Sequence, residues 1–116
     1  MTATIEDAAL LRIFIGEADK YQGRPLYEAI VLKAREAGLA GATVLRGPLG
    51  FGHGSVLHTA KILRLSADLP MVIEIVDRRE RIEAFLGQLE DMLGSALVTL
   101  EKVQVVRYGR AAERQP

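Results

Sequence analysis

Apolar and polar residues alternate with a period of two along residues 10–16, which is typical of a β-strand with one buried face. The two sides of this strand carry different residues, Leu11, Ile13 and Ile15 on one and Arg12 and Phe14 on the other. A short β-branched run predicts a second strand at 42–45. Residues 69–76 are apolar at nearly every position except Glu74, which predicts a central strand that begins near Pro70.

The pattern at 97–106 predicts the last strand, but its apolar positions change parity along the way. Val98 and Leu100 fall on one side, whereas Val103 and Val105 fall on the other. One extra residue in a strand would produce such a change, so we expect a β-bulge near residues 101–102.

Two segments show the three- and four-residue spacing of amphipathic helices. The first runs from Pro25, which suits the first helical position, to the natural terminator Gly38. The second begins with Asp77 as N-cap and Glu80 three residues later, a variant of the capping box, and stops at Gly94. Its apolar positions are Ile82, Phe85, Leu86, Leu89 and Leu93.

The expected order is therefore strand, helix, strand, strand, helix, strand. Right-handed crossovers then give a ferredoxin-like α+β sandwich (βαββαβ), with a four-stranded antiparallel sheet and two helices on one face. We expect residues 1–116 to form a single domain, with a folded core at about 8–108 and a tail at 109–116. One face of the sheet stays uncovered, either the one with Phe14, Val72 and Val76 or the opposite one with Leu11, Ile13, Ile15, Met71, Ile73 and Ile75. Whichever set faces the helices, the other is too apolar for water, so we expect subunits to pack their sheet faces together.

Composition narrows the classes of function. The absence of cysteine excludes disulfides and cysteine-based zinc sites, and fifteen basic against fifteen acidic residues leave no broad basic surface for nucleic acid. The N-terminus lacks a signal-peptide pattern, and no apolar run approaches the about 20 residues of a membrane span. We therefore expect a cytoplasmic protein with no membrane insertion.

The connection between the second and third strands, residues 46–68, is the candidate functional segment. It is longer than a hairpin needs, and loops beyond about 12–15 residues are usually functional or disordered. It opens with R-G-P-L-G-F-G-H-G-S, in which glycines fall at 47, 50, 52 and 54. Glycine lets main-chain N–H groups approach a ligand closely, so the stretch predicts either a ligand-binding loop or a flexible one.

Other candidates carry weaker signals. His53 and His58 could hold a metal ion, but no acidic residue lies between them to complete a ligand set, so no metal site is assigned. Arg78, Arg79 and Arg81 form a charged cluster that is usually a solvated face, although it could meet an anion or a neighbouring acid. Glu17, Asp19 and Lys20 indicate a polar turn. No nucleophile or paired carboxylates stand out, so we expect no enzymatic activity.

Several linked stretches resemble a known family. I-F-I-G-E-A-D-K, G-R-P-L-Y-E-A-I, G-L-A-G-A-T-V-L-R-G, G-F-G and L-P-M-V-I-E-I-V-D are together similar to the PII-like family catalogued as domain-of-unknown-function family 190. The resemblance covers about residues 10–106 and implies a homotrimer related to PII nitrogen-regulatory signal proteins. It also implies a signalling protein that binds a small ligand, with an adenine nucleotide as the expected one, and acts on a target protein through the loop at 47–68.

In PII proteins a G-F-G motif opens the long T-loop, which lines an intersubunit nucleotide cleft. The matching residues here are Gly50, Phe51 and Gly52. The resemblance implies that the two glycines let the main chain approach phosphate and that Phe51 anchors the loop base. The expected ligand-binding set is Gly47, Gly50, Phe51, Gly52, His53 and Gly54. Lys61 or Arg107 would supply charge, without a motif that requires either.

The chain also departs from the PII pattern. His53 stands where an arginine usually follows G-F-G, the loop has no tyrosine, and only Gly94, Ser95 and Ala96 occupy the place of a basic glycine-rich loop. The ligand is therefore expected to be a smaller nucleotide or another anion. Two alternatives remain open: a metal-responsive CutA-like trimer that uses His53 or His58, and a structural oligomerisation module without a ligand.

Overall fold

The computed structural model describes residues 3–51 and 68–108 of the chain. Its elements follow the expected order of strand, helix, strand, strand, helix, strand, with a small extra two-stranded sheet after the first strand. Their bounds are β1 Ala3–Gly16, β2 Lys20–Tyr21, β3 Arg24–Pro25, α1 Leu26–Glu36, β4 Thr43–Arg46, β5 Pro70–Asp77, α3 Arg79–Gln88, α4 Glu90–Leu93 and β6 Leu97–Tyr108. Within the described ranges, no helix is long and apolar enough to cross a membrane.

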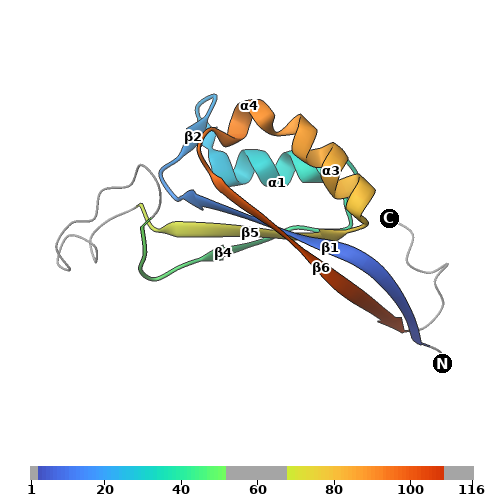
Figure 1. Ribbon diagram of the computed structural model, residues 1–116. Coiled ribbons are helices and arrows are strands. Elements are labelled where there is room, and N and C mark those ends of the chain that lie inside the picture. Colours follow the sequence, from blue (N-terminus) through green and yellow to red (C-terminus); the bar gives the residue numbers. More distant parts are fainter. Residues whose placement is uncertain (1–2, 52–67, 109–116) are drawn as a thin grey trace.

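The four long strands form one antiparallel sheet in the order β4-β5-β1-β6. The helices α1, α3 and α4 all lie over the same face of this sheet (Figure 1). This is the predicted ferredoxin-like α+β sandwich. Strand β5 is interior, as its apolar sequence predicted, and Pro70 is its first residue, where a missing N–H costs no ladder bond.

The core lies between the sheet and the helices. Alternate residues of β1 and β5 are buried there, because side chains on a strand point to opposite faces in turn. They pack against Ile30 of α1 and Ile82, Phe85 and Leu89 of the second helical segment, all at most 1% exposed. Among the described residues, no polar or charged side chain is buried in this core.

Both predicted helices begin one residue later than expected. Pro25 is the N-cap of α1, not its first helical residue, because its ψ of 134° is that of an extended residue. Arg78, not Asp77, is the N-cap of α3, and no side chain caps it. The capping-box prediction is wrong because Asp77 is the last residue of β5. Its carboxylate instead accepts hydrogen bonds from the Arg78 N–H at 2.7 Å and from the Ala40 N–H at 2.9 Å.

The predicted bulge in β6 is absent. Strand β6 pairs with β1 residue for residue, from Leu97 opposite Phe14 to Tyr108 opposite Ala3. The change in parity has another cause. Val98 and Leu100 pack against the core, whereas Val103 and Val105 lie on the opposite face of a continuous strand. The apolar side of β6 therefore changes from the face that the helices cover to the face that they leave open.

Strands β1 and β6 extend beyond the rest of the sheet. Strand β5 pairs only with residues 9–16 of β1, so residues 3–8 and 103–108 form a two-stranded arm (Figure 1). The predicted first strand, 10–16, did not include this extension. On the arm, Glu6 forms an ion pair with Arg107 at 3.2 Å, and the cross-strand pair of Ile5 and Val106 is exposed.

The sheet face opposite the helices, called here the open face, is mostly apolar. Phe14, Val72 and Val76 are the set that falls on it, together with Leu10 and Leu97, because the opposite set faces the helices. Arg12 lies among them and forms ion pairs with Glu74, at 2.9 Å, and with Glu101. The hydrogen bond to Glu74 is the main reason that the pKa of Arg12 is raised above its ordinary value.

The polar connector after β1 forms the β2–β3 hairpin, which the sequence analysis did not anticipate. Gln22 and Gly23 adopt positive φ angles of 50° and 83° at its turn, which matches the type I′ turns that favour glycine. The Tyr21 hydroxyl donates a hydrogen bond to Asp91 Oδ2 at 3.0 Å. This contact ties the hairpin to α4, and it raises the pKa of Tyr21.

Candidate functional site

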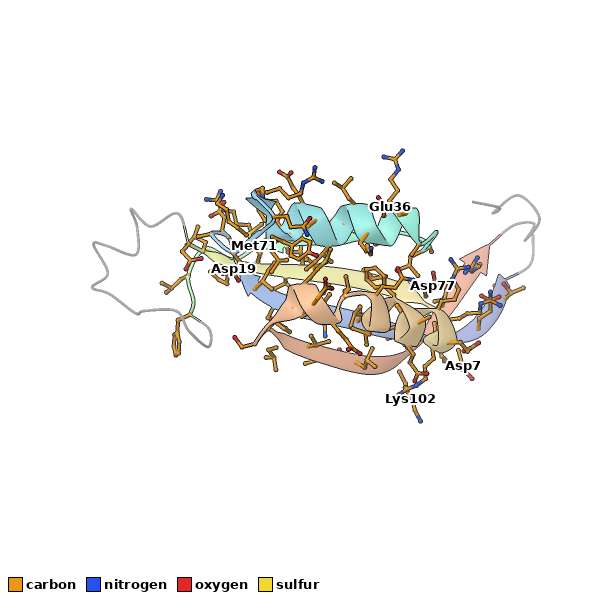
Figure 2. All side chains as sticks on the ribbon, turned by 90° about the horizontal axis from the view of Figure 1, so that it is seen from above. Asp7, Asp19, Glu36, Met71, Asp77 and Lys102 are labelled. Atoms are coloured by element: carbon orange, nitrogen blue, oxygen red, sulfur yellow. The ribbon has the colours of Figure 1, made fainter. Side chains whose placement is uncertain are left out.

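Three chain segments that are distant in sequence meet at one end of the sheet. They are residues 16–19 after β1, residues 46–51 after β4 and residues 68–71 at the start of β5, and we call them the loop base. Asp19 and Met71 mark this end in Figure 2. Two main-chain hydrogen bonds join the segments: Glu17 N–H donates to Leu69 O at 2.7 Å, and Gly47 N–H donates to Pro70 O at 2.8 Å.

Gly47 and Gly50, both predicted site residues, lie against the ring of Pro70. A Cβ on Gly47 would stand 2.9 Å from Pro70 Cγ, and a Cβ on Gly50 would stand 3.0 Å from the same atom. Gly50 also has a φ of 159°, which side chains rarely adopt. The packing against Pro70 therefore requires glycine at both positions, whether or not a ligand also approaches them.

The segment after Gly47 carries main-chain donors that have no acceptor among the described residues. The N–H groups of Leu49, Gly50 and Phe51 form no hydrogen bond with any residue that the structure describes. The side chains of Leu49 and Phe51 are 65% and 70% exposed, so Phe51 presents an open aromatic surface and does not pack at the loop base. The other predicted site residues, Gly52, His53 and Gly54, lie outside the described residues, as do Lys61 and His58.

Carboxylates fix the turn that follows β1. Asp19 Oδ2 accepts a hydrogen bond from the Gly16 N–H at 2.9 Å, and Asp68 Oδ1 accepts one from the Ala18 N–H at 3.1 Å. A Cβ on Gly16 would lie 2.4 Å from Asp68 Oδ1, so a larger residue there would displace this carboxylate from its hydrogen bond with Ala18. The turn at 16–19 is thus polar, as predicted, and it also holds the start of the segment that leads into β5.

An ion pair crosses the loop base above β5. Arg46 Nη2 lies 3.1 Å from Glu17 Oε1, with side-chain exposures of 57% for the arginine and 22% for the glutamate. Both residues flank Met71 and Leu69 on the side of the sheet that faces the helices. Glu17 Oε1 is closed off from solvent, and its contact with Arg46 lacks the geometry of a hydrogen bond. Arg46 is therefore the charge that compensates this carboxylate.

The predicted site residues did not include Pro70 or Glu17, and Arg46 and Asp68 entered only as the two ends of the predicted functional segment. The stretch R-G-P-L-G-F-G-H-G-S included Arg46 only as its first letter. The sequence does contain a signal for these residues: Glu17 follows Gly16 at the end of β1, and Asp68 lies just before β5. Only the strand order brings them together, because Ala18 and Asp68 are 50 positions apart.

The arginine cluster of α3 meets neighbouring acids. Arg79 pairs with Glu83 at 3.0 Å, and Arg81 pairs with Asp77 at 3.4 Å while also donating to Gly38 O. Of the three interpretations given for this cluster, contact with a neighbouring acid is thus confirmed for Arg79 and Arg81. Arg107 lies on the arm, at the opposite end of β1 from the loop base of its own chain.

A surface hollow of about 600 Å³ lies elsewhere, where the arm meets the start of α3. Asp7 and Lys102, which border it, are labelled in Figure 2 at the end of the molecule remote from Asp19. Arg79 and Glu80 complete its charged lining. These exposed side chains carry both signs of charge and do not define a ligand class. Over residues 3–51 and 68–108, no group of three or more histidines or acidic residues could hold a metal ion.

Comparison with known proteins identifies the family. The model of the DUF190 family, described as "Uncharacterized ACR, COG1993", matches residues 8–105. A UPF0166 protein of Aquifex aeolicus is 39% identical over 97 residues, which cover 84% of this chain and 91% of that protein. The UPF0166 protein MJ1524 of Methanocaldococcus jannaschii is 37% identical over 86 residues, which cover 74% of this chain and 79% of the relative.

Solved structures share the fold at lower identity. CPII of Thiomonas intermedia, in a complex with ADP, AMP and acetate, superposes with a TM-score of 0.63 at 18% identity, over 97% of this chain and 99% of CPII. A proposed PII-like signaling protein of Thermus thermophilus has a TM-score of 0.60 at 16% identity, over 87% and 90% of the two chains. The chain therefore belongs to the DUF190 family and has the PII-like fold, as the sequence resemblance implied.

Proposed function

We propose that this chain is a non-enzymatic PII-like regulator that binds an adenine nucleotide at its loop base. It works as a homotrimer, with the ligand in clefts between subunits, and it acts on a target protein through the loop at 47–68. The ligand favours one arrangement of this loop because it contacts that arrangement better, and the partner detects the difference. The signal is thus carried by binding equilibria and not by a chemical reaction.

The observation that carries the proposal is the set of unused donors at residues 49–51. Three successive main-chain N–H groups without an acceptor among the described residues begin two positions after Gly47, which packs against Pro70. Successive main-chain N–H groups in a glycine-rich turn are a recurrent anion site, because each partial positive charge is held in place by the backbone. The PII-like protein CPII, which shares the fold, has been solved with ADP and AMP, and this favours a nucleotide over other anions.

The open face supports the trimer. Phe14 and Val72 lie side by side on it as a cross-strand pair, and Leu97 continues the row on β6 while 61% exposed. A monomer rarely leaves so continuous an apolar surface to water. A stable interface buries about 800 Å² on each partner. A four-stranded face with strands of up to 14 residues is large enough to supply it.

Calorimetric titration of the full chain with ATP, ADP, AMP and cyclic AMP, each with and without Mg²⁺, tests the ligand. Gly50→Val should abolish binding because the new side chain meets Pro70, and the oligomer should persist. Gly41→Val is the matched control, since a Cβ there meets nothing within 4 Å. Saturation at one site per subunit supports the proposal, whereas a folded oligomer that gives no heat with any nucleotide contradicts it.

Light scattering coupled to gel filtration tests the assembly on the same sample. A mass of three chains of 12.7 kDa is expected. A monodisperse monomer at micromolar concentration would contradict the trimer. The absence of catalysis is tested by incubating the protein with each bound nucleotide, which should be recovered unchanged.

A further inference from the structure

We infer that Arg46 binds the phosphate group of the ligand and that Glu17 competes with this phosphate for the same guanidinium. The inference rests on the proposed function, because it names the side chain that recognises the anion at that site. Glu17 then sets the threshold of the response: a ligand binds only if its negative charge replaces that of the carboxylate.

The first step is the charge at the loop base. Over residues 16–19, 46–51 and 68–71, Arg46 is the only cation, and it stands among the three acids Glu17, Asp19 and Asp68. Asp19 and Asp68 each accept a hydrogen bond from a main-chain N–H of the turn at 16–19. Glu17 is the acid that pairs with Arg46. An anion that approaches this acidic surface therefore needs Arg46.

The second step is the availability of the arginine. A guanidinium has five N–H donors arranged as a fork that fits phosphate. Arg46 makes one ion pair within the described residues, to Glu17 at 3.1 Å, and its side chain is 57% exposed. Because that contact falls short of a hydrogen bond, the donors of the fork remain available. Arg46 precedes Gly47 directly, so it stands at the beginning of the segment that carries the unused N–H groups of residues 49–51.

The third step is the energetic cost of moving the Arg46 guanidinium from Glu17 to a phosphate. Among the described residues, Glu17 Oε1 accepts no hydrogen bond and has only the Arg46 guanidinium as an ion-pair partner, and it is closed off from water. When the guanidinium turns to a phosphate, this carboxylate loses its compensating charge. Binding is therefore a competition, and anions with more charge should displace Glu17 more readily. The affinity for adenosine, which has no phosphate, should not depend on either residue.

Calorimetry with adenosine, AMP, ADP and inorganic pyrophosphate on five proteins tests this competition. The proteins are the wild type, Arg46→Gln, Arg46→Lys, Glu17→Gln and Glu83→Gln. The last is a matched control, because Glu83 belongs to an exposed ion pair with Arg79 at 3.0 Å that is remote from the loop base. Both Glu→Gln variants remove one negative charge, so a general effect of net charge would appear in both. Circular dichroism and thermal melts establish that each variant is folded.

Arg46→Gln should lower the affinity for ADP about tenfold, which is the value of one charge-assisted hydrogen bond to phosphate. Arg46→Lys should recover part of this loss because it keeps the charge without the fork. Glu17→Gln should raise the affinity for ADP and for pyrophosphate about threefold, which is the scale of a partly exposed ion pair. Glu83→Gln should match the wild type, and adenosine should bind all five proteins alike.

Three results would overturn the inference while leaving the proposed function intact. The wild type binds ADP, but Arg46→Gln binds it equally well. Glu17→Gln binds ADP no more tightly than the wild type does. Glu83→Gln gains as much affinity as Glu17→Gln, so that the gain reports net charge alone. If the wild type binds none of the four compounds, the inference fails, and if it also binds neither ATP nor cyclic AMP, the proposed function fails with it.

Discussion

Replacing Gly47 with alanine tests the packing of the loop base. The added Cβ would stand 2.9 Å from Pro70 Cγ, whereas carbon atoms attract best at about 3.5–4.0 Å. The proline ring is closed on its own backbone, so it cannot rotate away from the contact. Relief requires either a shift of the first residue of β5 or the loss of the hydrogen bond from Gly47 N–H to Pro70 O, which measures 2.8 Å.

The expected cost follows from these two routes. Overpacking of a tight contact costs about 1–3 kcal/mol. Loss of one main-chain hydrogen bond costs about 1 kcal/mol. We therefore expect Gly47→Ala to lower the free energy of unfolding by about 2 kcal/mol, and this would move a urea midpoint by about 1 M when the m-value is about 2 kcal/mol/M.

The assay is urea unfolding followed by far-UV circular dichroism at one fixed protein concentration, because the stability of an oligomer depends on concentration. Gly41→Ala is the control, since its Cβ would meet nothing within 4 Å and its change should stay within about 0.5 kcal/mol. The reasoning is refuted if the two variants unfold at the same urea midpoint and bind ADP with equal affinity.

Three further predictions concern the core, the open face and a surface contact. Phe85→Ala should lower the free energy of unfolding by about 3–5 kcal/mol in the same urea assay, because the ring is 1% exposed; a loss below about 1 kcal/mol would contradict its place in the core. Phe14→Asp should shift the light-scattering mass from trimer to monomer, and an unchanged trimer would show that the open face is not the interface. Tyr21→Phe removes the hydrogen bond to Asp91, which favours the neutral phenol and raises the pKa of Tyr21 above its ordinary value of about 10. The bond therefore stabilises the fold below about pH 10 and is lost as the pH rises through the raised pKa, so the difference in Tm between wild type and variant should be constant from pH 6 to 9 and shrink above pH 10.

The fold followed from the sequence because its signals are local and agree with one another. The alternation of Leu11, Ile13 and Ile15 placed one face of β1 in the core, and all three are buried. Gly38, expected to end the first helix, adopts a φ of 76° just beyond α1, a conformation that suits glycine. The pattern of β6 was ambiguous, because its apolar residues change from one face of the strand to the other. The reason is that the helices cover only the first part of this strand, which the sequence of β6 alone does not show.

The failure at Asp77 shows how tertiary contacts override a local motif. Asp and Glu spaced three apart are typical of a helix start. However, the Asp77 carboxylate is drawn to the Ala40 N–H, which the crossover brings close from 37 positions away, and to Arg81. Nothing in residues 77–80 alone could reveal that competing donor.

The candidate site was predictable only in part for the same reason. The glycine spacing pointed to Gly47 and Gly50, whose positions against Pro70 show a need for close approach of some kind. The partner of Arg46 could not be named, because the contact with Glu17 requires the order β4-β5-β1 and the register of each pair. The ligand roles of these glycines stay predictions until the titrations are done.

The hydrogen bond from Gly47 to Pro70 fixes where the sheet ends, independently of the connection between β4 and β5. It is the last hydrogen bond of the β4–β5 ladder. On the β1 side, the turn at 16–19 forms hydrogen bonds with Asp68 and Leu69. The sheet thus ends at the same place whatever length of chain connects the two strands. Doubling the length of a flexible connection costs only about 0.6 kcal/mol in closure entropy. A change in the length of the connection between β4 and β5 should therefore leave the end of the sheet and the core behind it in place.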